Sequence, residues 1–257
     1  MKKVCFLLLI IWSTSAMQGL DPLEIIRKSH DAVRISSFQA VSTLSITDSR
    51  GNTRIRENTM ASKTYPDKTE KRIIKFIAPP EVEGTGILIF DHEEKADDMW
   101  IYLPALRKTR RIVSSEKSKS FMGSEFSNAD MSAPALEDFT YEMLGSGEIS
   151  GAPCWKIRSI PVTMDLEDEY GYSSSVSWIG KEDHVVRQTE YFDFDGELLK
   201  RIETLNFKLL EPEAGKYMVT GMVATNFRNG RSSEMKMEKI EIAETNDSYF
   251  TVNYLER

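Results

Sequence analysis

The chain has 257 residues, 33 Lys and Arg against 40 Asp and Glu, and a formal net charge of −7. A mean hydropathy of −0.37 and a charged fraction of 28% exclude a polytopic membrane protein, a collagen-like fibre and a disordered tail. The acidic balance, with an isoelectric point of about 5.2, argues against a nucleic-acid-binding protein.

The N-terminal segment has the layout of a secretory signal peptide. Two lysines precede an apolar run over residues 4–12, and small residues follow that run. The run is too short to span a bilayer comfortably. We therefore expect residues 1–19 to be a signal peptide, cleaved near 16–19, and residues 20–257 to form a single domain. Such a protein would be exported to the periplasm, where it could also associate with the periphery of a membrane.

The cysteine content predicts a chain without disulfides. Cys5 lies inside the signal segment and would leave with it, so the mature chain would hold one thiol, Cys154. The residues around Cys154 read as a strand, and burial there is a better interpretation than reactivity.

The predicted elements are one helix followed by many strands. Asp21 can cap a helix that has Pro22 in its first turn and Glu24 three residues after the cap. From Phe38 onward the apolar period changes to two, which is typical of strands. We expect strands over residues 38–46, 53–60, 72–77, 86–90, 99–103, 109–113, 154–162, 174–179, 185–192, 197–210, 217–228 and 232–243.

Two features of the connections bear on the fold class. Regular alternation stops over residues 114–141, where we expect a loop with one or two short helical turns. Asn229-Gly230 separates the last two strands and predicts a type I′ hairpin turn. Many hairpin-joined strands with few helices predict a mainly β protein, built as one antiparallel sheet that is strongly curved or partly closed.

Signals for catalysis and for metal binding are weak. The three histidines lack metal-ligand spacing, and no nucleophile elbow, phosphate loop or zinc-protease motif occurs. Ser124 follows a glycine but lacks the second glycine of an elbow, so a loop serine is the preferred interpretation. The acidic stretches at residues 91–98 and 167–169 are expected to be solvated loops. We expect no enzyme activity, no cofactor and no metal.

One cluster of positive charge stands against the acidic background. The cluster contains Arg107, Lys108, Arg110 and Arg111. Lys117 and Lys119 follow it closely in the sequence. Two interpretations explain the cluster equally well. It is either an ordinary exposed face of a strand and a loop, or a docking surface for an acidic partner or for anionic lipid headgroups.

Aromatic residues and methionines surround this basic segment. The expected ligand-binding residues are Trp100, Tyr102, Phe121, Met122 and Phe126. Four more methionines, at 218, 222, 235 and 237, lie in the last hairpin, where flexible side chains suit an adaptable apolar surface. Ordinary core packing remains the alternative for each residue, but a curved sheet with an apolar concave face could hold an acyl chain.

Residues 76–131 carry a series of strings that together resemble a known family. They are F-I-A-P-P at 76–80, G-T-G-I-L at 84–88, W-I-Y-L-P at 100–104, R-R at 110–111 and F-M-G-S-E-F at 121–126. This pattern resembles the LolA-like family of outer membrane lipoprotein-sorting proteins, in its spirochaete-type form. The resemblance implies an incomplete antiparallel β-barrel whose concave face is covered by helices, and it supplies no catalytic residue.

Three functions follow as expectations, in descending order. The first is a periplasmic carrier or binding protein for lipid or lipoprotein acyl chains, working between an inner-membrane exporter and an outer-membrane acceptor. The second is a docking module of a resistance-nodulation-division exporter, and the third is a lipid-acting hydrolase that uses Ser124. We also expect Arg110 or Arg111 to pair with Glu125 or Asp130 and so to fix the loop that closes the cavity.

Overall fold

The computed structural model describes residues 21–92 and 95–257, so the expected signal peptide lies outside the described residues. The helices are α1 (Pro22–Ala32), α2 (Met164–Tyr170) and α3 (Val252–Leu255). The first strands are β1 (Ser37–Thr47), β2 (Thr53–Thr64), β3 (Glu70–Ala78), β4 (Gly86–Asp91), β5 (Asp98–Leu103) and β6 (Lys108–Ile112). The others are β7 (Phe139–Ile149), β8 (Ala152–Pro161), β9 (Ser174–Gly180), β10 (Val186–Phe192), β11 (Leu198–Glu211), β12 (Lys216–Asn226) and β13 (Ser232–Glu241).

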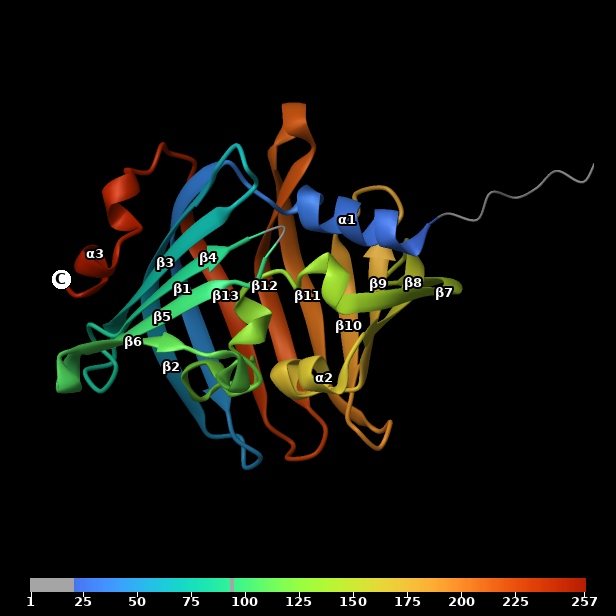
Figure 1. Cartoon of the computed structure of the whole chain (residues 1–257), viewed down its shortest axis with the longest axis horizontal. Coiled ribbons are helices and arrows are strands. Elements are labelled where there is room, and N and C mark those ends of the chain that lie inside the picture. Colours follow the sequence, from blue (N-terminus) through green and yellow to red (C-terminus); the bar gives the residue numbers. More distant parts are fainter. Residues whose placement is uncertain (1–20, 93–94) are drawn as a thin grey trace, which may run out of the picture.

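The described strands form one curved antiparallel sheet (Figure 1). Its order is β6-β5-β4-β3-β2-β1-β13-β12-β11-β10-β9-β8-β7, so only the β1–β13 pairing joins strands that are distant in sequence. The two free edges, β6 and β7, are consecutive in the chain, and no hydrogen-bond ladder joins them in the described residues. The expected mainly β fold, an antiparallel barrel that does not close, is confirmed.

A crossing segment, residues 113–138, connects these two free edges over the concave face (Figure 1). It contains four short 3₁₀ turns, η2 (Ser114–Glu116), η3 (Phe121–Gly123), η4 (Ala129–Met131) and η5 (Leu136–Asp138). We expected one or two turns, and single turns of this kind leave no apolar period to detect. Phe121, Phe126 and Met131 bury their side chains in the inner core of the barrel.

Helix α1 covers another part of the concave face. Asp21 caps it by accepting a hydrogen bond from the Leu23 amide at 3.0 Å, as expected. Ile25 and Ile26 are buried against Ile157 and other apolar residues of β8 to β10. Within the described part of the chain, no helix is long and apolar enough to cross a membrane.

Strands β3 to β5 have two covered faces. Ile74, Ile87 and Met99 point into the barrel, whereas their neighbours Leu88 and Trp100 face outward. The outer side chains pack under a C-terminal segment, residues 247–255, which includes α3. Sheet pleating therefore serves two separate cores, one inside the barrel and one outside it.

Two elements differ from the sequence-based expectations. Strand β7 was missed because it is an edge strand interrupted by Gly145 and Gly147, which weakens the alternation. Helix α2 was also missed, and its acidic residues were wrongly interpreted as a solvated loop. Thr163 caps its start by accepting from the Leu166 amide, and Gly171 ends it in the left-handed region.

The last hairpin has a longer turn than expected. Strand β12 ends at Asn226, whose amide donates to the Arg231 carbonyl at 2.9 Å, so residues 227–230 form a four-residue loop. Gly230 has a positive φ of 67°. A type I′ turn needs both central residues in the left-handed region, and Asn229 lies outside it. The prediction of a type I′ turn was therefore wrong. Cys154 is fully buried as expected, and burial raises the pKa of its thiol.

Gly86 allows the C-terminal helix to touch the outer face of β4. A Cβ at this position would lie 2.6 Å from Leu255 Cδ1 and 3.3 Å from the Leu255 carbonyl oxygen. Leu255 is fully buried in the outer core. The glycine is therefore a contact surface for α3.

We predict that Gly86→Ala lowers the free energy of unfolding by about 1–3 kcal/mol, because the added methyl overpacks this contact. Urea unfolding measures the change. In the Leu255→Ala background, where the nearest atoms are gone, the same substitution should cost much less. An equal cost in both backgrounds would contradict the proposed contact.

Candidate functional site

A cavity of about 350 Å³ lies between the inner face of the sheet, the end of α1 and part of the crossing segment. We call that part, residues 129–134, the roof. The volume is at the lower end of the range of about 300–1,000 Å³ that is usual for ligand sites. The larger apolar side chains of the lining are Val33, Ile35, Phe38, Phe126, Met131, Val186, Ile202, Met218, Val219, Met222 and Met237.

Three methionines of the last hairpin form much of the sheet-side wall. Met218 and Met222 come from β12, and Met237 comes from β13. Their unbranched, polarizable side chains can adjust to ligands of different shape. Met235 instead belongs to the closely packed inner core. The sequence identified this methionine cluster, although not as the main wall of a cavity.

One end of the cavity is polar, and arginine and carboxylate side chains line it. We call Arg34, Glu70, Arg72 and Asp91 the charged end. Glu70 pairs with Arg72 and accepts a hydrogen bond from the Ser62 hydroxyl at 2.6 Å. Burial acts to raise the pKa of Glu70, but the Arg72 charge and these hydrogen bonds outweigh it and hold the pKa below its usual value.

Two residues of the charged end also bind the backbone of the roof. The Arg72 guanidinium donates to the Met131 carbonyl at 2.7 Å, and the Asp91 carboxylate accepts from the Ala133 amide at 2.9 Å. Side chains from β3 and β4 thus hold the crossing segment at its middle. Opening the cavity at this point would break both contacts.

Asp91 is a buried carboxyl rather than the solvated residue expected from its acidic stretch, with an exposed fraction of 7%. Burial, followed by the nearby charges of Asp97 and Glu70, raises its pKa to about 7. Burial also raises the pKa of Asp97. The expectation of a solvated loop was wrong here because the roof covers this end of β4.

A buried ion pair holds the roof on the other side of the cavity. Lys200 of β11 pairs with Asp130, and its ammonium lies 4.7 Å from the centre of the Tyr191 ring. Asp130 also accepts a hydrogen bond from the Ser127 amide at 2.7 Å. Both charges of the pair are therefore compensated within the protein.

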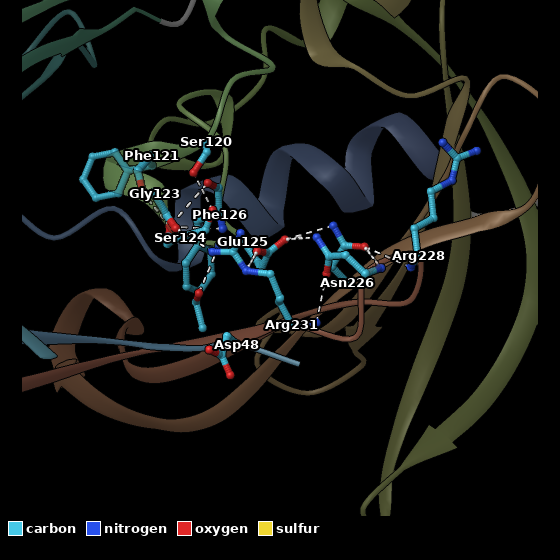
Figure 2. A network of polar contacts seen from close by, with 12 residues as sticks. Asp48, Ser120, Phe121, Gly123, Ser124, Glu125, Phe126, Asn226, Arg228 and Arg231 are labelled. Carbon is cyan, nitrogen blue, oxygen red and sulfur yellow. Dashed lines mark hydrogen bonds and ion pairs between the residues drawn. The ribbon is translucent and has the colours of Figure 1, made fainter. Parts of the chain in front are cut away.

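The motif loop, residues 120–126, is fixed to the barrel by its own polar network (Figure 2). Glu125 lies 2.9 Å from Arg231 Nε and accepts from Asn226 Nδ2 at 2.9 Å. Arg231 also donates to the Gly123 carbonyl at 3.0 Å, and Arg56 donates to the Met122 carbonyl. Contacts from β2, β12 and the final turn thus hold the loop against the sheet.

The expected pairing of Arg110 or Arg111 with this loop was wrong. Arg110 pairs with Glu116 at 2.6 Å, and Arg111 pairs with Asp98. Both arginines lie on the edge strand β6 and find carboxylates close to it, whereas basic residues from β2 and the last hairpin contact the motif loop.

Ser124 has a structural position inside the motif loop. It is 3% exposed, its hydroxyl donates to the Phe121 carbonyl at 2.7 Å, and the hydroxyl accepts from the Phe126 amide at 3.2 Å. No hydrogen bond between the described residues joins Ser124 to a histidine or a carboxylate. The hydroxyl therefore stabilises the turn.

The structure separates the five expected ligand-binding residues. Phe126 lines the cavity, while Phe121 and Met122 pack beside it in the inner core. Trp100 and Tyr102 share a strand face as predicted, but this face is the outer one, under the C-terminal segment. The sequence missed the end of α1 and the wall residues of β10 and β11, which only the curvature of the sheet brings together.

The basic cluster is divided in the same way. Arg107 and Lys108 are exposed in the β5–β6 hairpin, and neither forms an ion pair with any described residue. Arg110 and Arg111 are neutralised by the carboxylates named above, and Lys117 pairs with Glu169 at 2.6 Å. Arg110 and Arg111 are exposed too, so the hairpin tip is the part of the expected docking surface whose charge no described carboxylate neutralises.

An unclosed antiparallel sheet with a helix and a crossing segment over an apolar concave cavity defines a LolA-like protein, and solved structures agree. A domain from Vibrio parahaemolyticus described as an outer membrane lipoprotein-sorting protein superposes with a TM-score of 0.83 at 27% identity, covering 92% of this chain and 98% of its own. A DUF1329 family protein from Desulfovibrio piger gives 0.82 at 25%, covering 92% and 100%. A LolA superfamily protein from Nitrosomonas europaea gives 0.69 at 17%, again covering 92% and 100%, and shows the fold alone.

The family assignment follows from residues 68–257, which match a family model described as "Uncharacterized protein". This match spans more than half of the sequence, so the chain belongs to that family. The resemblance to LolA-like proteins is confirmed by the structural matches. No curated protein matches the sequence.

We predict that Arg231→Ala frees the motif loop, because it removes the ion pair to Glu125 and the hydrogen bond to Gly123. Limited digestion with proteinase K should then cut within residues 120–126 faster than in the parent protein. Arg110→Ala, which removes an ion pair outside the motif loop, is the matched control. Equal protection in both variants would contradict this assignment.

We predict that Asp91 makes the folded state less stable as pH rises. The folded protein keeps the Asp91 proton up to about pH 7, whereas the unfolded chain loses it near the ordinary value, so stability falls between about pH 4 and 7 and then levels off.

Comparing urea unfolding of the parent and Asp91→Asn over this range isolates the contribution of Asp91, since asparagine keeps an acceptor for the Ala133 amide. The variant should show a smaller fall, and its advantage should be greatest above pH 7. Asp195→Asn, at an exposed carboxylate in the β10–β11 turn, should follow the parent. Parallel curves for the parent and Asp91→Asn would refute the prediction.

Proposed function

We propose that this protein is a periplasmic carrier or binding protein that buries an acyl chain of a lipid or lipoprotein in the cavity beneath the roof. The observation that carries the proposal is the apolar lining, with methionines 218, 222 and 237 on the sheet side and Phe126 and Met131 on the roof side. Each methylene moved from water into such a lining contributes about 0.8 kcal/mol.

A protein cavity can bind an acyl chain about as strongly as a membrane does. A single myristoyl chain binds a bilayer with an association constant of only about 10⁴ M⁻¹. A cavity that buries a similar length of chain can therefore compete with a membrane while still releasing its cargo. The many apolar side chains that line the cavity fit a ligand that is recognised by its shape and its apolar surface.

Two further observations support this proposal. The Vibrio parahaemolyticus domain, which shares 27% identity over nearly all of both chains, is described as an outer membrane lipoprotein-sorting protein. The expected signal peptide at residues 1–19 agrees with a periplasmic location. The cargo of the relative is proposed here for this chain as a class, acyl chains, rather than as a particular lipoprotein.

The exposed basic residues of the β5–β6 hairpin support a second role, docking to a partner, in addition to carrying an acyl chain. Arg107 and Lys108 project from a protein of net charge −7, so they present a local positive field to an acidic surface. We propose that this tip contacts the membrane partner of the carrier, an inner-membrane exporter or an outer-membrane acceptor. Such a contact would weaken as salt screens it.

The first test is native mass spectrometry of the protein purified from a bacterial envelope, followed by organic extraction. We expect an acyl species at near-stoichiometric level, or uptake of one when the empty protein is incubated with lipids and lipopeptides. A protein that stays empty under both conditions would contradict the carrier proposal.

A pair of variants places the bound chain in the cavity. Met222→Trp fills the space at the wall. It should weaken the binding of a fluorescent fatty acid by at least about tenfold, equivalent to about 1.4 kcal/mol. Leu205→Trp adds the same side chain at a position of β11 that is 47% exposed, and it should bind as the parent does. Equal affinities would mean that the ligand binds elsewhere.

A further inference from the structure

We propose that the charged end of the cavity binds the anionic head group of the cargo, so that the preferred ligand is a single-chain amphiphile with an acidic oxygen head. This inference rests on the proposed function and deepens it, because it gives the ligand a polarity and an orientation. The chain would lie along the methionine wall, and its head would lie between α1 and β3.

The placement of the two arginines carries the proposal. Arg34 projects from just beyond α1, and Arg72 projects from β3, yet both line the same cavity. Their side chains are 11% and 24% exposed, so their charges act at the margin of an apolar space where water screens them little. Guanidinium groups match the planar geometry of carboxylates and the oxygens of phosphates.

Arg72 also has one buried hydrogen-bond donor without a partner among the described residues. One terminal nitrogen donates to the Met131 carbonyl, the other donates to Glu70, and the Nε–H is buried without a partner among the described residues. A buried donor without a partner destabilises the protein. A ligand oxygen that reached this nitrogen after a small shift of the side chain would remove that penalty.

The charge balance of this end is set by Asp91. Arg34 pairs with Asp31 at 3.2 Å and Arg72 pairs with Glu70, so each arginine already has one carboxylate partner. An ionised Asp91 adds a negative charge that opposes an acidic head, and protonation of Asp91 removes that charge. The Asp91 carboxyl faces Glu70 and Arg72 of β3 and Asp97 from the loop before β5. The other charged or titratable groups that line a small pocket with it are Arg27, His30, Asp31 and Arg34 from α1 and its end, and His92. Burial and the neighbouring carboxylates, which raise the pKa of Asp91 to about 7, make that protonation available near neutral pH.

The other charged group at the cavity does not offer such a site. Lys200 is bound to Asp130, and Asp130 lines the cavity whereas Lys200 is not among the lining residues. An anion arriving there would meet the carboxylate of Asp130 before the ammonium. The arginine end is therefore the favoured position for an acidic head.

Matched probes separate the contributions of head and chain. Displacement of a fluorescent fatty acid from the purified protein is measured with tetradecanoate, methyl tetradecanoate, tetradecyl phosphate and inorganic phosphate. We expect tetradecanoate and tetradecyl phosphate to bind at least about tenfold more tightly than the methyl ester at pH 6.5. This advantage should shrink at pH 8.5, where Asp91 is ionised, and inorganic phosphate should not displace the probe.

Variants assign the effect to the arginines. Arg34→Gln should remove most of the advantage of tetradecanoate while leaving methyl ester binding unchanged. Arg27→Gln is the matched control, because Arg27 lies on α1, one to two turns before Arg34, pairs with Glu24 at 3.0 Å and does not line this cavity. The charge-neutral double variant Glu70→Gln/Arg72→Gln removes both members of the second ion pair together, and it too should reduce the advantage of tetradecanoate.

Each outcome bears on a different claim. Equal binding of tetradecanoate and its methyl ester would overturn the head-group site and leave the carrier function standing. Failure of every chain-bearing probe to bind would overturn the carrier function itself. Displacement by inorganic phosphate as strong as that by tetradecyl phosphate would show a site for free anions, and it too would overturn the proposal.

Discussion

The crossing segment is the constraint on which the rest of this structure depends. The sheet is open between β6 and β7, which are consecutive in the chain, so the residues that connect them must pass over the concave face. A segment in that position covers the barrel interior, and its backbone groups need partners there. Its own 3₁₀ turns supply some of these partners, and side chains of the barrel supply the others.

This arrangement explains why the cavity is apolar in the middle and polar at its margins. The side chains that fix the roof to the sheet, such as Arg72, Asp91 and Lys200, must lie where the roof meets the strands. Between these anchors the roof contributes Met131, and the sheet contributes methionines 218 and 222. An apolar space bounded by fixed charges suits a ligand with one apolar and one polar part.

Sequence reasoning predicted the strands well because pleating imposes a period of two wherever a face is buried. It also placed Trp100 and Tyr102 on one face. It did not determine which face, because both sides of β3 to β5 are covered and both are apolar. Strand β7 escaped detection through its glycines. The cavity wall escaped because residues as far apart as Val33 and Met237 meet only when the sheet curves.

The central claim is that the ligand lies against the methionine wall. Methionine methyl groups labelled with ¹³C report this directly by NMR during titration with tetradecanoate. The account predicts shifts for Met218, Met222 and Met237 and none for Met164, which is 79% exposed at the start of α2. Saturable binding without shifts at the three wall methionines would contradict it.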